Sequence, residues 1–174
     1  MRPACDSGKK CVVKLPSPRA LFALGFFVPV ALVVSAIVLT VGYHVAACPL
    51  CIVQRMLYLS IAVVSLLGLV SQRVTRVVAA LIAVAASAAG AVIAGYQIYL
   101  QRNPFSATCG DGSSWWEQMV EQAGNALPLF FKADGLCSDA TWSLIGVSIV
   151  ESSLLAFCGL LVGGLLALFS SLRR

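Results

Sequence analysis

Apolar residues follow one another in four long stretches of the chain, and most charged residues lie in the segments between them. The stretches run from Leu21 to Tyr43, Ile52 to Val70, Val77 to Leu100 and Trp142 to Phe169. Each is long enough to cross a hydrocarbon layer of about 30 Å at about 1.5 Å per helical residue. None alternates strictly between polar and apolar positions, as barrel strands would. The pattern therefore predicts an all-α membrane protein, a bundle of four transmembrane helices.

Composition agrees with this pattern and limits the size of the molecule. The 174 residues are 60% apolar and only 11% charged, with a mean hydropathy of +0.94. Soluble domains carry about a quarter charged residues, so a water-soluble domain is excluded. We expect one integral membrane domain over residues 1–174. The first stretch should persist as a helix, because it is long and lacks a small-residue cleavage site before Cys48.

The basic residues predict how the bundle lies in the membrane. Nine of the twelve Lys and Arg residues fall before the first stretch, between the second and third, or at the C-terminus. Because basic residues in short loops mark the cytoplasmic side, we expect residues 1–20, 71–76 and 170–174 in the cytoplasm. Residues 44–51 and 101–141 would then face outward. The net charge of +5 thus reflects topology, and nucleic acid is not expected as a partner.

The second outward segment, residues 101–141, is too long to be a bare connector. Its apolar residues recur at approximate helical spacing between polar ones, which predicts a short amphipathic helix at the membrane interface. The residues of this pattern are Trp115, Trp116, Met119, Val120, Ala123 and Leu127. Such a helix either docks a partner or only holds the loop against the bundle, and the sequence leaves both roles open.

Four of the seven cysteines fall in the outward segments, where disulfides form and persist. They are Cys48, Cys51, Cys109 and Cys137. Four cysteines allow three pairings, of which the most economical joins the two cysteines within each segment, although the sequence does not prove it. The other three are Cys5 and Cys11, expected as free cytoplasmic thiols, and Cys158, expected as a small packing residue.

Cys48 and Cys51 form a C-x-x-C motif where the second stretch begins. Free backbone N–H groups and the positive end of a helix stabilise a thiolate there, so we expect a reactive pair. Arg55 follows Cys51 by about one helical turn, and an arginine so near the membrane interior is costly without a partner. That partner is either the Cys51 thiolate or a bound polar ligand. Alternatively, the arginine extends to the lipid headgroups.

His44, the only histidine, lies one turn before Cys48. It is a candidate to transfer a proton, since imidazole titrates near neutral pH, but a polar cap on the first helix is the simpler role. The sequence carries no haem or nucleotide motif and predicts no metal site. Electrons that reach the C-x-x-C pair would therefore leave to a lipid-soluble acceptor such as a quinone.

These residues resemble those of a known family. The run from Cys48 to Arg55, Cys-Pro-Leu-Cys-Ile-Val-Gln-Arg, is similar to the signature of the DsbB family, bacterial membrane quinone reductases that reoxidise the periplasmic dithiol oxidase DsbA. The resemblance continues in order and spacing through Tyr99-Leu100-Gln101, Asn103-Pro104-Phe105, Ala107-Thr108-Cys109, Leu127-Pro128, Cys137 and Trp142. It therefore spans all four stretches and both outward cysteine pairs.

The resemblance implies a role for each outward cysteine. Cys109 would form the mixed disulfide with a DsbA-like thioredoxin-fold oxidase, and Cys137 would pass the electrons on to Cys48. Cys51 would face the quinone, ubiquinone or menaquinone, and Arg55 would help to hold it. The resemblance also implies the bacterial inner membrane as the location. The sequence departs from the family at Gln97, where a histidine is common, in its longer basic N-terminus, and at Glu151, which has no clear counterpart.

Other classes of protein fit the sequence less well. A non-catalytic membrane scaffold would use the outward cysteines as structural disulfides or a zinc site, but the cation of Arg55 would repel a metal. A four-helix transporter would need ionisable residues at mid-membrane, and only Glu151 comes near that position. A reductase of quinone-like vitamin epoxides shares the C-x-x-C motif, but we would expect it at the far end of a helix.

Overall fold

Four long helices form the body of the structure, a computed structural model that describes residues 17–43, 47–103, 115–127, 131, 143–144 and 147–173. They are α1 (Pro18–Gly42), α2 (Pro49–Val70), α3 (Arg73–Arg102) and α6 (Ile149–Leu172). Within these described ranges, all four are long and apolar enough to cross a membrane. The predicted all-α bundle of four transmembrane helices is confirmed.

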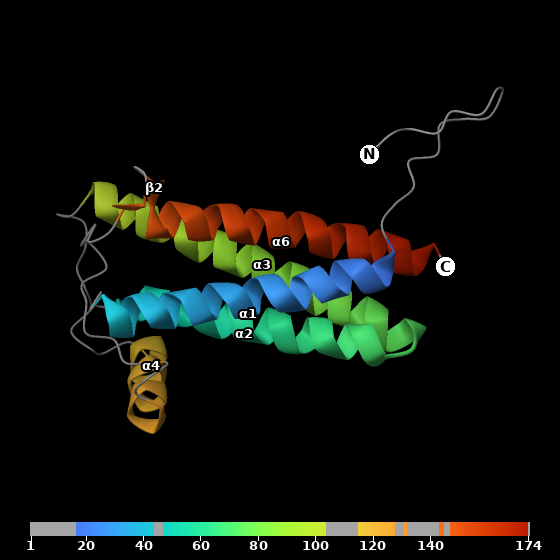
Figure 1. The fold of residues 1–174 in the computed structure, drawn as a ribbon, viewed down its shortest axis with the longest axis horizontal. Helices are drawn as coiled ribbons and strands as arrows, with labels where there is room; N and C mark the ends of the chain where they lie inside the picture. Colours follow the sequence, from blue (N-terminus) through green and yellow to red (C-terminus); the bar gives the residue numbers. More distant parts are fainter. Residues whose placement is uncertain are drawn as a thin grey trace.

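The helices are arranged in a ring, in which α1 contacts α2, α2 contacts α3, α3 contacts α6 and α6 contacts α1. In Figure 1, α6 and α3 run along one side of the bundle and α1 and α2 along the other. The end of α1, the start of α2, the end of α3 and the start of α6 lie together, and we call this the cysteine end because Cys48 precedes α2 there. The opposite end, with Arg19, Arg73, Arg76 and Arg173, is called the basic end.

The short helix predicted between the third and fourth spanning helices is present as α4 (Trp115–Ala126). It lies beside the cysteine end and runs crosswise to the bundle (Figure 1), the direction that a helix in a membrane interface takes. Val120, only 2% exposed, packs against Ala47 and Ile52 and so fixes α4 to the start of α2. Met119 and Leu127 are exposed, and a partner-docking role for α4 stays a prediction.

The fourth spanning helix begins at Ile149 rather than at Trp142, which lies outside the described residues. Ser148 caps α6: its hydroxyl accepts a hydrogen bond from the Glu151 backbone N–H at 3.1 Å, and the Glu151 carboxylate accepts one from the Ser148 N–H at 3.0 Å. This reciprocal capping box starts a helix efficiently. Before it, β1 (Ser143–Leu144) pairs antiparallel with β2 (Val147–Ser148). Hydropathy does not detect either feature, because the strands are only two residues long and the capping box consists of two polar residues, Ser148 and Glu151, within an apolar stretch.

The centre of the bundle is closed by an aromatic pair that joins three helices. Phe157 of α6 is fully buried and stacks on Tyr58 of α2, with ring centroids 4.1 Å apart and planes inclined by 6°. The Phe157 ring also covers Gly90 of α3, where a Cβ atom would collide with it. Gly90 therefore permits α3 and α6 to approach closely, as small residues commonly do between membrane helices.

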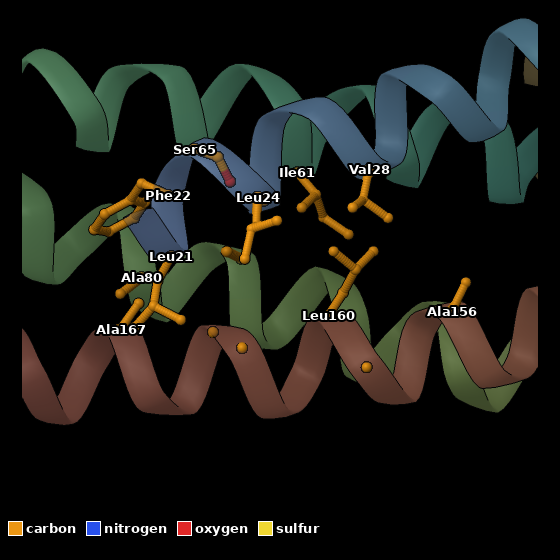
Figure 2. Close-up of a pocket in the computed structure, with 15 residues that line it drawn as sticks. Leu21, Phe22, Leu24, Val28, Ile61, Ser65, Ala80, Ala156, Leu160 and Ala167 are labelled. Carbon is orange, nitrogen blue, oxygen red and sulfur yellow. The ribbon is translucent and has the colours of Figure 1, made fainter. Parts of the chain in front are cut away.

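A cavity of about 310 Å³ lies between α1 and α6, in the half of the bundle toward the basic end. Figure 2 shows Leu24 and Val28 of α1 facing Leu160 of α6 across it. Its lining is almost entirely apolar, with Ser65 of α2 the main polar contribution, and neither cysteine of the C-x-x-C motif contributes to it. The cavity is thus separate from the cysteine end.

Two arginines at the basic end hold the helix termini together. Arg73 donates a hydrogen bond to the Leu172 carbonyl at 2.9 Å, which joins α3 to the end of α6. Arg76 donates to the carbonyls of Gly68 at 3.3 Å and Ser71 at 3.0 Å. The last carbonyls of a helix have no partner within it and attract cations. These side chains therefore satisfy the ends of α2 and α6.

Candidate redox site

The sulfur of Cys48 is the N-terminal cap of α2. Cys48 has an extended backbone (φ −84°, ψ 162°), and its Sγ accepts a hydrogen bond from the backbone N–H of Cys51 at 3.4 Å. Pro49 follows as the first helical residue, a position where the missing N–H costs nothing. The local sequence thus places the Cys48 sulfur at the positive end of the helix, which favours a thiolate.

The two sulfurs of the motif are in contact. The Cys48 thiol donates to the Cys51 Sγ over 3.1 Å, and both cysteines are in the thiol form. Cys48 is buried, with 4% of its surface exposed, whereas Cys51 is half-buried. Thiol–disulfide exchange requires one sulfur to reach another. This pair is close enough to form an intramolecular disulfide, and Cys51 is its more accessible member.

Gln97 of α3 places its side-chain amide against both sulfurs. Its Nε2 donates to Cys48 Sγ at 3.2 Å and to Cys51 Sγ at 3.1 Å. Its Oε1 accepts a hydrogen bond from Nε2 of Gln54, on α2, at 2.8 Å. Gln97 is 2% exposed and Gln54 is 5% exposed. The pair therefore lies against a buried polar group that is itself held by a second amide.

The hydrogen bonds continue from Gln54 to α6. The Ser153 hydroxyl donates to Gln54 Oε1 at 2.6 Å. The Tyr58 hydroxyl lies 2.9 Å from Ser153 Oγ and also donates to the Ser153 carbonyl at 3.1 Å. A continuous polar chain thus runs from Tyr58 to the two sulfurs and joins α2, α3 and α6.

Arg55 extends from α2 to α1. Its Nη2 donates to the Thr40 hydroxyl at 2.7 Å and to the Ala36 carbonyl at 3.3 Å, and the residue is 8% exposed. Its charge is close enough to Cys51 to interact with that sulfur electrostatically. Because the guanidinium is buried between α2 and α1, it does not extend to the lipid headgroups, which was one of the alternatives that the sequence left open. Arg55 thus brings a positive charge beneath the pair and links it to α1.

Three of the predicted site residues lie outside the described part of the chain: His44, Cys109 and Cys137. Their roles stay predictions. Cys158, expected as a packing residue, is instead exposed on α6, so its side chain faces outward from the bundle.

Glu151 has a structural role at the start of α6. Besides its part in the capping box, it forms an ion pair with Arg102 at the end of α3, with 3.3 Å between carboxylate and guanidinium. The Arg102 side chain is 72% exposed. Glu151 therefore lies at the end of the bundle, and the transporter alternative loses its one candidate for a charge at mid-membrane.

Sequence reasoning did not identify Gln54, Ser153 or Tyr58, and it noted Gln97 only as a departure from the resembled family. A signal was present, since polar side chains inside apolar stretches need partners in the membrane. The sequence does not state which helices face each other, however, and so it did not connect these residues.

Similarity to known proteins shows the family. Residues 18–167 match the family described as disulfide bond formation protein DsbB. The chain belongs to the DsbB family. It is similar to disulfide bond formation protein B of Methylobacillus flagellatus, with 38% identity over 84% of this chain and 90% of the relative. For the protein of the same name from Stutzerimonas stutzeri, identity is 34% over 93% of this chain and 99% of the relative. As a DsbB family member with four spanning helices, the chain is a multi-pass membrane protein.

Proposed function

We propose that this protein is a membrane thiol:quinone oxidoreductase that reoxidises a periplasmic, DsbA-like dithiol oxidase of the thioredoxin fold. The observation that carries this proposal is the contact between the Cys48 and Cys51 sulfurs at the start of α2, with Arg55 one turn below. The names of the relatives, disulfide bond formation protein B, support the same direction of chemistry.

The first step is an exchange at the long outward loop. A thiolate of the reduced partner attacks Cys109 of a Cys109–Cys137 disulfide, which forms a mixed disulfide and releases the Cys137 thiolate. The partner's second thiolate then attacks the mixed disulfide, so the partner leaves oxidised. Two electrons have passed to Cys109 and Cys137. Such exchange needs mobile, accessible sulfurs outside the bundle.

The second step transfers the electrons to the helix start. The Cys137 thiolate attacks Cys48 of a Cys48–Cys51 disulfide and displaces the Cys51 thiolate. Cys109 then resolves the Cys48–Cys137 bond, and the loop disulfide is restored. The positive end of α2 and the nearby Arg55 charge stabilise the negative charge that develops on the displaced Cys51 sulfur.

The residues around Cys51 fit a quinone. Cys51 is half-buried and packs, like the partly buried Val53, Met56 and Phe131, against one apolar cluster at the start of α2, and such an apolar environment suits a flat apolar ring. The Arg55 guanidinium suits an acceptor oxygen of such a ring. A bound quinone, ubiquinone or menaquinone, supplies the final acceptor of two electrons and two protons. Cys51 and Arg55 would hold it, and His44 is a further candidate through its place in the sequence.

The same proposal fixes the orientation. The cysteine end and α4 face the periplasm, and the basic end faces the cytoplasm of a bacterial cell, with both termini on the cytoplasmic side of the inner membrane. The arginines at the basic end support this orientation because cytoplasmic ends of membrane helices are rich in Lys and Arg.

The test combines the purified protein in lipid nanodiscs with a reduced thioredoxin-fold oxidase and a quinone, and follows quinone absorbance. We expect one quinone to be consumed per dithiol oxidised. Cys51→Ala should abolish this turnover. Cys158→Ala, which removes an exposed cysteine on α6, is the matched control and should leave the rate unchanged.

Absence of quinone loss with every periplasmic thioredoxin-fold partner tried would refute the proposal. Equal turnover by the Cys51→Ala and wild-type proteins would also refute it, because the electrons would then bypass the pair. In either case the scaffold alternative, with structural disulfides or a zinc site, would be favoured.

A further inference from the structure

The hydrogen bonds of the polar chain that leads from Ser153 through Gln54 and Gln97 to the C-x-x-C pair all run in one direction. The Ser153 hydroxyl donates to the carbonyl oxygen of Gln54, so the Gln54 amide nitrogen is left to donate to the carbonyl oxygen of Gln97. The Gln97 nitrogen is left, in turn, to donate to the two sulfurs. Every donor therefore points toward Cys48 and Cys51.

Tyr58 completes this chain at its far end. Because the Ser153 proton is directed to Gln54, the Ser153 oxygen can accept at 2.9 Å from the Tyr58 hydroxyl, whose single proton is shared with the Ser153 carbonyl at 3.1 Å. Hydrogen bonds in series polarise one another in a medium of low dielectric constant. The aligned dipoles present their positive end to the sulfurs, and this is the end that stabilises a thiolate.

The opposite orientation of the two amides would serve only one redox state. A Gln97 carbonyl that faced the sulfurs would need S–H donors, which a dithiol has but a thiolate or a disulfide lacks. Both glutamines are nearly completely buried, so water does not replace a missing partner. In the observed orientation, the Gln97 N–H groups donate to the two sulfurs, and a sulfur can accept a hydrogen bond as a thiol, as a thiolate or in a disulfide.

We propose that Gln97 is a catalytic residue of the Cys48–Cys51 pair, stabilising its thiolate form, and that Gln54 and Ser153 are positioning residues that fix the direction of the Gln97 amide. The inference rests on the proposed function, since it assumes that the pair cycles between disulfide and dithiol. Loss of the donors destabilises the reduced pair more than the disulfide. The pair then becomes a weaker oxidant.

A purely structural role is the competing explanation, because polar side chains commonly join membrane helices. That role would change the stability of the bundle but not the balance between the two redox states. The decisive measurement is therefore the redox equilibrium of the pair, made alongside thermal unfolding.

The experiment uses the full chain in nanodiscs, with Cys109 and Cys137 replaced by alanine so that no loop sulfur exchanges with the pair. The protein is equilibrated with dithiothreitol redox buffers, and free thiols are then alkylated. The peptide from Ala20 to Arg55, which trypsin releases, contains Cys48 and Cys51 and no other cysteine. Its mass gives the oxidised fraction of this pair alone.

In Gln97→Met, which keeps the length of the side chain without its donors, we expect the equilibrium to shift about tenfold toward the disulfide, or about 30 mV for two electrons. Ser153→Ala should shift it about twofold to threefold in the same direction. Two matched controls should not shift it. Ser152→Ala removes an exposed neighbouring hydroxyl, and Ser87→Ala removes a buried hydroxyl of α3 that bonds only within its helix among the described contacts.

Identical equilibria for wild type and Gln97→Met would overturn this inference and leave the proposed function standing. If Gln97→Met does not fold, the redox equilibrium of Ser153→Ala is compared with that of Ser152→Ala. Identical equilibria in these two variants would equally overturn the inference. Failure of the wild-type pair to be reoxidised by quinone would instead refute the proposed function.

Discussion

Arg55 is the residue for which the membrane environment is most demanding. A buried guanidinium is costly unless hydrogen bonds and a charge compensate it, and here Thr40 and the Ala36 carbonyl supply hydrogen bonds from α1. The same contacts hold the charge one turn below Cys51, so α1 takes part in the site without contributing a reacting atom. Arg55 thereby links helix packing to the chemistry of the pair.

Replacing Arg55 by methionine should weaken quinone binding while exchange at Cys109 continues. Arg55→Met removes a charged donor, and a hydrogen bond to a charged group contributes about 1.5–3 kcal/mol, so we expect the apparent affinity for quinone to fall about tenfold or more. Steady-state kinetics with varied quinone measure this. Arg102→Met, which removes an exposed arginine at the same end, is the control. An unchanged apparent affinity would show that Arg55 is only structural.

The two loop cysteines should differ in how they trap a partner. Cys137→Ala leaves a Cys109 thiol that a partner disulfide captures, with no second sulfur to release it, so a mixed disulfide should accumulate. Cys109→Ala should trap much less, because Cys137 lies close in sequence to the fourth spanning helix. Non-reducing gels measure both, with a partner that retains only its attacking cysteine, carried as a mixed disulfide with thionitrobenzoate, which the attacking loop thiolate displaces. Equal trapping would contradict the order of the relay but not the reductase activity.

Among the helices, the contact of α3 with α6 depends on the absence of a side chain at Gly90. The Phe157 ring occupies the space that a Cβ atom would need, and the Tyr58 ring stacks on it. Tyr58 also ends the polar chain that leads to the cysteines. The packing of this aromatic pair therefore sets the distance between the helices that carry Gln97 and Ser153.

Gly90→Ala should destabilise the bundle by about 1–3 kcal/mol, the usual cost of overpacking a core. Thermal unfolding in detergent measures the change. Gly95→Ala, also on α3 but with open space around its Cβ position, is the matched control and should be neutral or slightly stabilising. Comparable losses in both variants would mean that the glycine matters for the backbone of α3 rather than for the ring contact.

The elements differ in how far the sequence predicts them. Helix number and type follow from the apolar stretches, because a membrane requires about 20 such residues for each span. The start of α6 does not follow, since the Ser148–Glu151 capping box lies within an apolar context. Likewise, the C-x-x-C motif and Arg55 are visible in the sequence. The contacts among Gln97, Gln54 and Ser153 arise only when three helices pack together. Gln97 is 43 residues and Ser153 is 99 residues from Gln54 along the chain.

At the scale of the whole molecule, the two ends of the bundle are built differently. The basic end is held by arginines on helix carbonyls, whereas the cysteine end carries the reactive pair, α4 and the Glu151–Arg102 ion pair. Exchange with a soluble partner needs one end exposed to it. Under the proposed function, this asymmetry makes the orientation in the membrane a functional requirement.

That orientation can be tested with single cysteines in a chain whose native cysteines are replaced by serine. Gln122 is exposed on α4, and Gln72 is exposed between α2 and α3. A membrane-impermeant maleimide should label Gln122→Cys in intact spheroplasts, and should label Gln72→Cys only after the membrane is permeabilised. The reverse pattern would invert the proposed topology.

The role of the Cys48 sulfur as the cap of α2 also affects how much of an inactive Cys48 variant a cell would contain. This sulfur caps α2 and, in the proposed cycle, also reacts. Alanine would therefore remove two functions at once, and loss of a cap costs about 0.5–2 kcal/mol. Serine keeps an acceptor for the Cys51 N–H and removes only the chemistry. A Cys48→Ser protein should therefore accumulate in the membrane without turning over, whereas quality control would lower the abundance of Cys48→Ala.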